Sequence, residues 1–223
     1  MIGQPSMTNV SSQSFRDRVE AGELLAEKLA AYRDRDDVVV LALPRGGVPV
    51  AREVARTLAV PFDVFVVRKL GVPGHEELAM GAIATGGVRQ VNRDVVEALG
   101  IPGNVIDAVA ERELRELDRR EQAYRGNRAP TPLTNKTVIL VDDDVATGST
   151  MRAAVMAARK QQPARVIVAV PVGAASTCAD LATEADDVVC VRTPDPFIAV
   201  GLWYRDFTPT TDHEVRALLG KDT

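Results

Sequence analysis

With 223 residues, 46% of them hydrophobic, and a formal net charge of −4, the chain is long enough for one large domain or for a domain with a small appendage. The weak negative charge gives no general attraction to nucleic acid or to a membrane surface, and an aromatic content of 4% argues against base-stacking platforms for RNA. No apolar run approaches the ~20 residues of a membrane span, and the N-terminus lacks the basic and then apolar pattern of a signal peptide.

The two cysteines, Cys178 and Cys190, do not have the spacing of metal ligands. We therefore expect reduced, partly buried thiols and a cytoplasmic protein.

The N-terminal part of the chain predicts a tail, a helix and a buried strand. Residues 1–14 are rich in Ser, Thr, Asn and Gln, a composition typical of disorder. Residues 15–32 carry apolar side chains at helical spacing, which predicts an amphipathic helix on the outside of a sheet. The continuous apolar run at residues 38–43 predicts a parallel strand that is buried on both faces.

A short turn follows this strand and reads Pro44-Arg45-Gly46-Gly47. Glycine permits a close backbone approach or a positive φ, and Arg45 offers a guanidinium to an anion. We expect a helix at residues 48–58 and a strand at residues 62–67. Lys69 comes at the end of that strand, where open α/β sheets bind ligands, and is either a ligand contact or a solvated side chain.

A charged helical region separates the two halves of the predicted sheet. The pattern of residues 94–124 predicts helix, with Asn104 as a cap of its long part and with Leu114 and Leu117 on one face. Acidic and basic residues alternate along it, which is typical of a solvated face. We interpret residues 94–128 as a helical insertion that packs on the sheet or at a subunit contact.

The most informative stretch is residues 138–150. Four apolar residues predict a buried strand, and three carboxylates follow at once, those of Asp142, Asp143 and Asp144. A turn of small residues then leads into a predicted helix at residues 151–159 and offers N–H groups and hydroxyls to an anion. Carboxylates repel phosphate but suit sugar hydroxyls or Mg²⁺, so a ribose 5-phosphate satisfies both parts. The alternatives are a turn without a ligand and an acidic Mg²⁺ pocket of the phospho-receiver type.

This stretch resembles the signature of the type I phosphoribosyltransferases at all thirteen positions, with Asp144 as the clear departure. The resemblance implies that Asp142 and Asp143 bind the ribose hydroxyls of phosphoribosyl pyrophosphate (PRPP). It also implies a phosphate loop that holds the 5-phosphate, formed by Ala146, Thr147, Gly148, Ser149 and Thr150.

The same resemblance assigns roles to other segments. It implies that the turn with Arg45, Gly46 and Gly47 binds pyrophosphate, that a non-proline cis peptide lies at or near Arg45, and that Lys69 is a second pyrophosphate contact. Residues 71–87, which include His75, occupy the place of the family's flexible catalytic loop. His75 is either part of this lid or an exposed loop residue.

The C-terminal segments complete an α/β pattern. Strands are expected at residues 165–170 and 187–191, with a helix at residues 174–185 between them. Alternating strands and helices predict a doubly wound, mainly parallel sheet at residues 15–191. Residues 192–223 resemble the hood and C-terminal helix of 6-oxopurine enzymes.

In such a hood Phe197, with Ile198, binds the base, and Trp203 or Tyr204 are the alternatives for stacking. Two departures concern the acceptor. Ala146 stands where hypoxanthine-guanine enzymes have an Asp, and Val172 lies where they have a lysine.

The resemblance implies a Mg²⁺-dependent enzyme of nucleotide salvage that transfers phosphoribosyl from PRPP to a nitrogen acceptor, most simply a nucleobase. Arg45, Asp142 and Asp143 are its predicted catalytic residues. Mg²⁺ is expected to be held mainly by PRPP, with Asp142, Asp143 or Asp206 as contacts through water. We expect a homodimer without a nucleic-acid partner. The alternative hypothesis is a PRPP-sensing regulator with little or no transferase activity.

Overall fold

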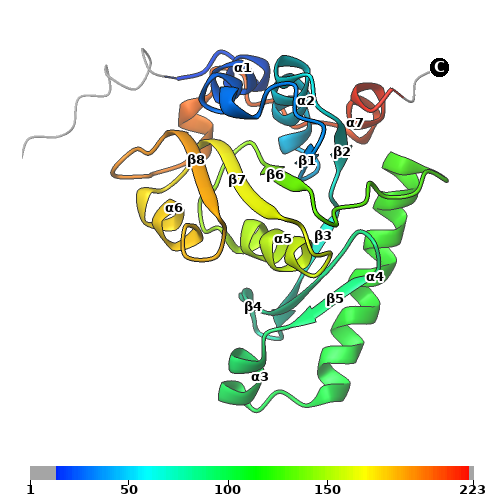
Figure 1. The fold of residues 1–223 in the computed structure, drawn as a ribbon. Coiled ribbons are helices and arrows are strands. Elements are labelled where there is room, and N and C mark those ends of the chain that lie inside the picture. Colours follow the sequence, from blue (N-terminus) through cyan, green and yellow to red (C-terminus); the bar gives the residue numbers. More distant parts are fainter. Residues whose placement is uncertain (1–13, 221–223) are drawn as a thin grey trace, which may run out of the picture.

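The computed structural model describes residues 14–220, so residues 1–13 of the predicted tail lie outside the described range. A five-stranded parallel sheet in the order β2-β1-β6-β7-β8 forms the centre (Figure 1). Its strands are β1 Val38–Ala42, β2 Phe62–Val64, β6 Thr137–Val141, β7 Arg165–Val172 and β8 Asp187–Arg192.

Helices cover both faces of this sheet, which confirms the predicted doubly wound α/β fold (Figure 1). Helices α1 (Arg18–Lys28) and α2 (Gly47–Leu58) lie on one face, and α5 (Ser149–Arg159) and α6 (Ala175–Leu181) lie on the other. Successive residues of a strand point to opposite faces, so each continuous apolar run contributes side chains to two hydrophobic cores, one on each face of the sheet. Val38 and Val40, for example, join the α1–α2 core, whereas Val39 joins the core with α5.

A second, antiparallel sheet packs on the outer side of α5, which therefore lies between two sheets (Figure 1). It contains β3 (Val67–Val72), β4 (His75–Ala84) and β5 (Val88–Val91). Residues 71–87, where a flexible loop was expected, are thus largely strand. Gly81 permits close strand contact, because a Cβ there would lie 2.4 Å from the carbonyl oxygen of Gln90.

The helical region divides where the sequence pattern predicted one long run. Asn92 caps α3 (Arg93–Leu99), and Gly100 ends it with φ +60°. Helix α4 (Gly103–Arg125) then begins after Pro102, so the prediction of Asn104 as its cap is wrong. Leu117 of α4 is buried, but Leu114 is 46% exposed, so the two leucines do not share a buried face.

Two other boundaries differ from the predictions. The N-terminal helix begins only at Arg18, because Asp17 caps it, and a short 3₁₀ segment, η2 (Ala30–Tyr32), follows α1. The strand predicted at residues 62–67 is split into β2 and β3, because the chain leaves the parallel sheet there and enters the antiparallel one.

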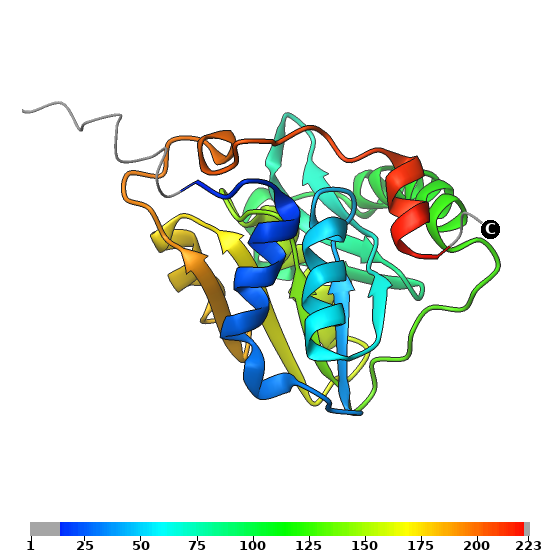
Figure 2. The same cartoon turned by 90° about the horizontal axis from the view of Figure 1, so that it is seen from above.

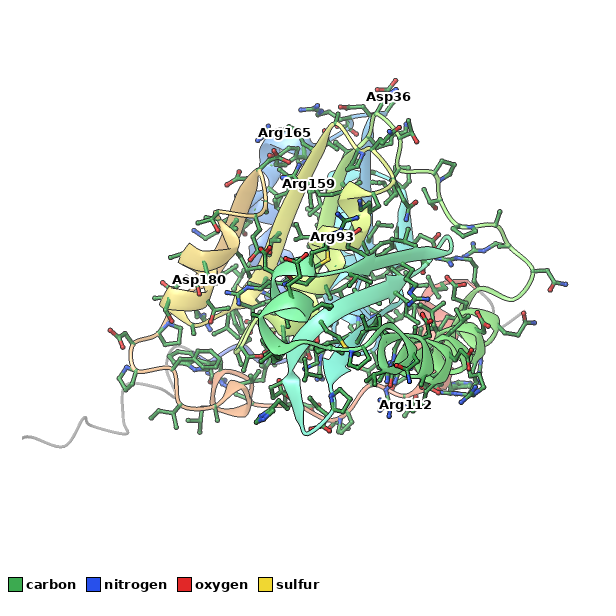
Figure 3. The ribbon with its side chains drawn as sticks, turned by 90° about the horizontal axis from the view of Figure 1, so that it is seen from below. Asp36, Arg93, Arg112, Arg159, Arg165 and Asp180 are labelled. Atoms are coloured by element: carbon green, nitrogen blue, oxygen red, sulfur yellow. The ribbon has the colours of Figure 1, made fainter. Side chains whose placement is uncertain are left out.

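After β8 the chain crosses the top of the sheet as the hood, which contains η3 (Val200–Trp203) and ends in α7 (Asp212–Leu218) (Figure 2). Helix α7 lies beside α4, where the hydroxyl of Tyr124 donates a 2.7 Å hydrogen bond to Asp212. The strands of the parallel sheet begin at the far edge, which Asp36 and Arg165 mark in Figure 3. Within residues 14–220 no helix combines the length and the apolar character needed to cross a membrane.

Candidate active site

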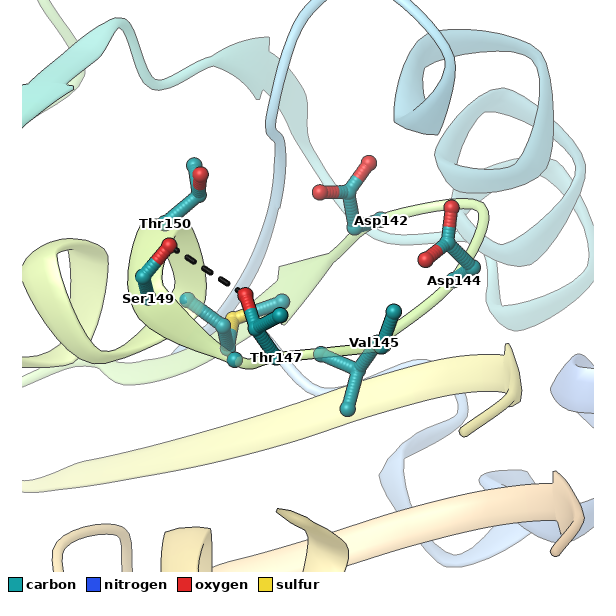
Figure 4. Close-up of a pocket in the computed structure, with 9 residues that line it drawn as sticks. Asp142, Asp144, Val145, Thr147, Ser149 and Thr150 are labelled. Carbon is teal, nitrogen blue, oxygen red and sulfur yellow. Dashed lines mark hydrogen bonds between the residues drawn. The ribbon is translucent and has the colours of Figure 1, made fainter. Parts of the chain in front are cut away.

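A pocket of about 210 Å³ opens at the carboxyl end of β6, between the predicted acidic residues and the phosphate loop (Figure 4). Asp142 and Asp144 lie at one end of it, and the hydroxyls of Thr147, Ser149 and Thr150 lie at the other. The pocket is lined by Asp142, Asp144, Val145, Ala146, Thr147, Gly148, Ser149, Thr150 and Met151. The carboxylates and the turn that the sequence predicts to bind an anion thus face a common space.

The phosphate loop takes its shape from Gly148, which precedes α5 with φ +73° and ψ 0°. Few residues other than glycine adopt this left-handed conformation at low cost. Ser149 and Thr150 begin the helix, so N–H groups at its first turn are not used inside it. This arrangement can bind a phosphate through N–H groups and hydroxyls together.

The neighbouring helix α6 supports the loop from behind. The hydroxyl of Thr177 donates a 2.7 Å hydrogen bond to the carbonyl oxygen of Ala146. Val145 pairs with the end of β7, because its N–H donates to Val172 (2.9 Å) and its carbonyl accepts from Ala174 (3.0 Å). The start of the loop is therefore anchored to the end of β7 and to α6 before any ligand binds.

The three consecutive carboxylates do not point the same way. Asp142 and Asp144 line the pocket, whereas Asp143 does not line it and is buried, with 7% of its surface exposed. Nε of Arg18 donates a 2.8 Å hydrogen bond to Oδ2 of Asp143. Asp143, which was predicted to bind ribose, is thus engaged by a residue of α1.

Burial and mutual repulsion disfavour charge on the two pocket carboxylates. Burial, followed by the neighbouring Asp143 and Asp144, raises the pKa of Asp142 well above its usual value. Burial and Asp143 raise the pKa of Asp144 to about 6. A ligand whose hydroxyls donate hydrogen bonds to these carboxylates would stabilise their charged forms and lower both pKa values.

The turn at Arg45 lies against the acidic residues. The peptide bond between Pro44 and Arg45 is cis, as predicted. A Cβ at Gly46 would lie 2.2 Å from Oδ2 of Asp143, and one at Gly47 would lie 3.0 Å from Oδ1 of Asp142. The two glycines therefore serve a close approach to the carboxylates, and neither has a positive φ.

Arg45 itself extends towards the C-terminal helix. Its Nη1 atom lies 3.6 Å from Oδ1 of Asp212, and half of its side chain is exposed. Lys69 reaches the phosphate loop from β3, with Nζ 3.5 Å from Oγ of Ser149 and 3.2 Å from Glu77. Lys69 therefore contacts a residue of the pocket, whereas the guanidinium of Arg45 is turned towards Asp212. Their binding of pyrophosphate stays a prediction.

The hood places its aromatic residues unequally. Trp203 and Tyr204 are buried with Phe15, and Phe197 is half-buried against this cluster. Ile198 is 72% exposed. Among the described residues that line the 210 Å³ pocket, neither Phe197 nor Ile198 occurs, so their contact with a base also stays a prediction.

His75 stands at the exposed start of β4, at the tip of the β3–β4 hairpin, beside Glu76 and Glu77. Cys178 and Cys190 are free thiols and partly buried, as the sequence predicted. A hydrogen bond between them lowers the pKa of Cys178 and raises that of Cys190.

Sequence reasoning missed the two residues that support the site from outside the motif, Arg18 and Thr177. Arg18 lies 125 positions from Asp143 in a helix whose charged residues looked solvated, so no local signal indicated it. Thr177 follows the strand next to β6, and its place at the carboxyl end of the sheet was the only available hint.

Comparison with known proteins relates this chain to the phosphoribosyl transferases. A family model described as a phosphoribosyl transferase domain matches residues 16–204. Rv0571c of Mycobacterium tuberculosis (strain ATCC 25618 / H37Rv), named as a candidate phosphoribosyl transferase, is 49% identical over 207 residues, or 93% of this chain and 46% of that protein. The chain therefore spans about half the length of the curated relatives that it matches first.

Two further proteins are similar to this chain over most of their own length. The bifunctional protein PyrR of Thermus thermophilus is 33% identical over 151 residues, which are 60% of this chain and 83% of that protein. The crystal structure of TT1426 from Thermus thermophilus superposes with a TM-score of 0.86 at 42% identity, covering 92% of this chain and 97% of that one.

Proposed function

Since the chain belongs to the phosphoribosyl transferase family, we propose that it transfers the 5-phosphoribosyl group of PRPP to a nitrogen acceptor, a nucleobase, and releases pyrophosphate. The observation that carries this proposal is the 210 Å³ pocket with carboxylates at one end and the phosphate loop at the other. A ribose 5-phosphate has the complementary groups, because its hydroxyls donate to carboxylates and its phosphate accepts from N–H groups.

The residues around the pocket suit the charge changes of this transfer. The bond from C1 of the ribose to pyrophosphate breaks and its electron pair leaves with pyrophosphate. C1 then bonds the acceptor nitrogen, and that nitrogen gives its proton to the released pyrophosphate or to water. Asp142 holds the ribose hydroxyls and favours the cationic ribosyl group, while Arg45 and Lys69 supply positive charge for the phosphates. The ribose hydroxyls donate to the charged form of Asp142, and the pKa of this carboxyl is raised. The affinity of the protein for PRPP should therefore fall as the pH falls and Asp142 takes up a proton.

Mg²⁺ fits the site as an ion carried by PRPP. Within residues 14–220 no group of three or more His, Cys, Asp or Glu side chains could hold a metal ion. Of the three carboxylates expected to contact it through water, Asp143 pairs with Arg18 and Asp206 accepts from Thr208, which leaves Asp142 facing the pocket. When bound, Mg²⁺ neutralises charge on the leaving pyrophosphate.

A second candidate function is a PRPP-sensing regulator with little or no transferase activity. The similarity to PyrR, a protein named as bifunctional, supports this second candidate, because it implies that a relative has a function besides its first one. The two functions share the pocket, so binding of PRPP alone does not separate them. Release of pyrophosphate with an acceptor does, because only the enzyme breaks the bond at C1.

The deciding experiment follows pyrophosphate release from Mg-PRPP with a panel of nucleobases. We expect release with at least one base, loss of release on chelation of Mg²⁺, and strongly reduced release in Asp142→Asn. PRPP binding without release from any base supports the regulator. Failure of the wild type to bind Mg-PRPP contradicts both functions.

The proposal includes a cytoplasmic homodimer that serves nucleotide salvage. Reduced cysteines are typical of the cytoplasm, and the exposed faces of α3 and α4 offer area for a subunit contact. Sedimentation equilibrium checks the dimer, because a single species at the monomer mass of 24.0 kDa contradicts it.

A further inference from the structure

Arg18 joins three segments that are far apart in the sequence. Its Nε donates to Oδ2 of Asp143 at 2.8 Å, and its Nη1 donates to the carbonyl oxygen of Thr208 in the hood, also at 2.8 Å. Its guanidinium lies over the ring of Phe207, 4.2 Å from the ring centre. The side chains of Arg18 and Asp143 are each only 11% exposed, so solvent screens their interaction weakly.

The hood holds Asp143 at a second point. The hydroxyl of Tyr204 donates a 2.6 Å hydrogen bond to the carbonyl oxygen of Asp143, and the ring of Tyr204 stacks on Phe207 with centres 4.9 Å apart. Asp143 is therefore fixed by its side chain through Arg18 and by its main chain through Tyr204. A displacement of the hood at Tyr204 or Thr208 therefore breaks a contact with Asp143 or with Arg18.

The opposite side of Asp143 touches the turn that is predicted to bind pyrophosphate. A Cβ at Gly46 would collide with its carboxylate, so the Asp143 side chain fills the space between Arg18 and this turn. Asp142, the next residue, faces the pocket. The orientation of Asp143 thus sets the backbone from which Asp142 extends towards the ribose position.

We propose that Arg18 is a positioning residue that couples occupation of the ribose position to the placement of the hood. This inference rests on the proposed function, since it takes PRPP as the ligand of the pocket. Arg18 acts through Asp143 and does not itself line the pocket. By thermodynamic linkage, a hood held by Arg18 strengthens PRPP binding, and bound PRPP stabilises the hood to the same extent.

The experiment compares Arg18→Met, Arg18→Lys and the control Arg56→Met. Arg56 pairs with Glu53 on the surface of α2, and its side chain is 57% exposed. Calorimetry measures the affinity of each variant for Mg-PRPP and for inorganic phosphate, which needs only the phosphate loop. Trp203, the single tryptophan of the chain, lies buried in the hood, so its fluorescence reports hood placement.

Arg18→Met should bind Mg-PRPP about tenfold more weakly, the effect of losing one charge-assisted hydrogen bond, with phosphate affinity unchanged. In the wild type Mg-PRPP should change the emission of Trp203, and in Arg18→Met this change should be absent. Arg18→Lys keeps the charge but not the fork that reaches both Asp143 and Thr208, so it should be intermediate. Arg56→Met should match the wild type.

Wild-type PRPP affinity and a wild-type fluorescence response in Arg18→Met overturn the inference, as does an equal loss of affinity for both ligands. If Arg18→Met does not fold, the same criteria apply to Arg18→Lys. A wild-type protein that binds phosphate but not Mg-PRPP contradicts the proposed function as well, and this outcome is visible before any variant is made.

Discussion

The hydroxyl of Thr177 lies 2.7 Å from the carbonyl oxygen of Ala146, and the methyl group of the same threonine occupies the space next to Gly148. One side chain of α6 therefore fixes the phosphate loop in two ways. It bonds the backbone at the start of the loop, and it excludes any side chain at the glycine that turns the loop into α5.

Gly148→Ala tests this arrangement, with Gly87→Ala as the matched control. Both glycines have φ +73°, but a Cβ at Gly148 would lie 2.7 Å from Cγ2 of Thr177, whereas nothing lies within 4 Å at Gly87. We expect Gly148→Ala to lower the free energy of unfolding by ~2–4 kcal/mol and Gly87→Ala by ~1 kcal/mol, because only the first adds a collision to the backbone strain. If urea unfolding gives the same decrease in the free energy of unfolding for both variants, the Thr177 side chain moves aside without an energetic cost and the explanation is wrong.

Asp142→Asn and Asp143→Asn should have different effects, because only Asp142 faces the pocket. Asp142→Asn should weaken Mg-PRPP binding by ~2–3 kcal/mol with little loss of stability, since it removes a charged acceptor of ribose hydroxyls. Asp143→Asn leaves the guanidinium of Arg18 without its carboxylate and should lower the free energy of unfolding by ~1–3 kcal/mol. Because Arg18 acts through Asp143, this variant should also weaken Mg-PRPP binding about tenfold, as expected for Arg18→Met. Calorimetry and chemical unfolding measure both, and unchanged PRPP affinity in the double variant contradicts the assignment of the ribose site.

Stability should depend on pH through Asp144. Its raised pKa of about 6 means that the folded protein binds this proton more tightly than the unfolded chain does, whose carboxyl has a pKa of 3.8. The resulting stability is fully present below pH ~4 and is lost as the pH rises through 6. Asp144→Asn has no carboxyl to titrate and does not lose this stability. The free energy of unfolding of the variant, relative to that of the wild type, should therefore rise by ~1–2 kcal/mol between pH 4 and pH 7.5. This is less than the full pKa shift implies, because the carboxyl is partly exposed. A difference that does not change with pH contradicts this account.

Neither hypoxanthine nor guanine should be an efficient acceptor. Ala146 cannot act as a general base, and Val172 is fully buried and cannot donate to a purine carbonyl. General-base assistance is worth ~10²–10⁴-fold and an unpaired buried carbonyl costs ~1–3 kcal/mol, so the missing base matters more. Steady-state assays should give kcat/KM below ~10⁴ M⁻¹s⁻¹ for both purines, the lower end of ordinary enzymes. A higher value would mean that another group, such as Asp144, handles the proton.

The central motif could be predicted because its signals are local. A buried apolar strand, a glycine that permits positive φ and a helix of small residues stand next to one another at residues 138–159, and each has its own physical cause. The same holds for the turn at Arg45. These segments carry the pocket, so the sequence predicted its position in the fold and its two halves.

The partner of Asp143 and the antiparallel sheet could not be predicted in this way. Arg18 meets Asp143 only because α1 packs across the sheet beneath the hood, a relationship that no spacing in the sequence encodes. Glycines at residues 71–87 indicated a loop, but Gly71 and Gly81 are there because a neighbouring strand leaves no room for a Cβ. A glycine chosen for packing and one chosen for flexibility look the same in a sequence.

Pairing of Phe15 with the hood has a consequence for the order in which this protein assembles during synthesis. The N–H of Phe15 donates to Trp203 and its carbonyl accepts from Arg205, both at 2.8 Å. These contacts close a loop that contains the whole parallel sheet, so they form only after the last strand has left the ribosome. Synthesis therefore delivers the phosphate loop and its support, Thr177, before it delivers Tyr204 and Thr208, the hood residues that hold Asp143 and Arg18.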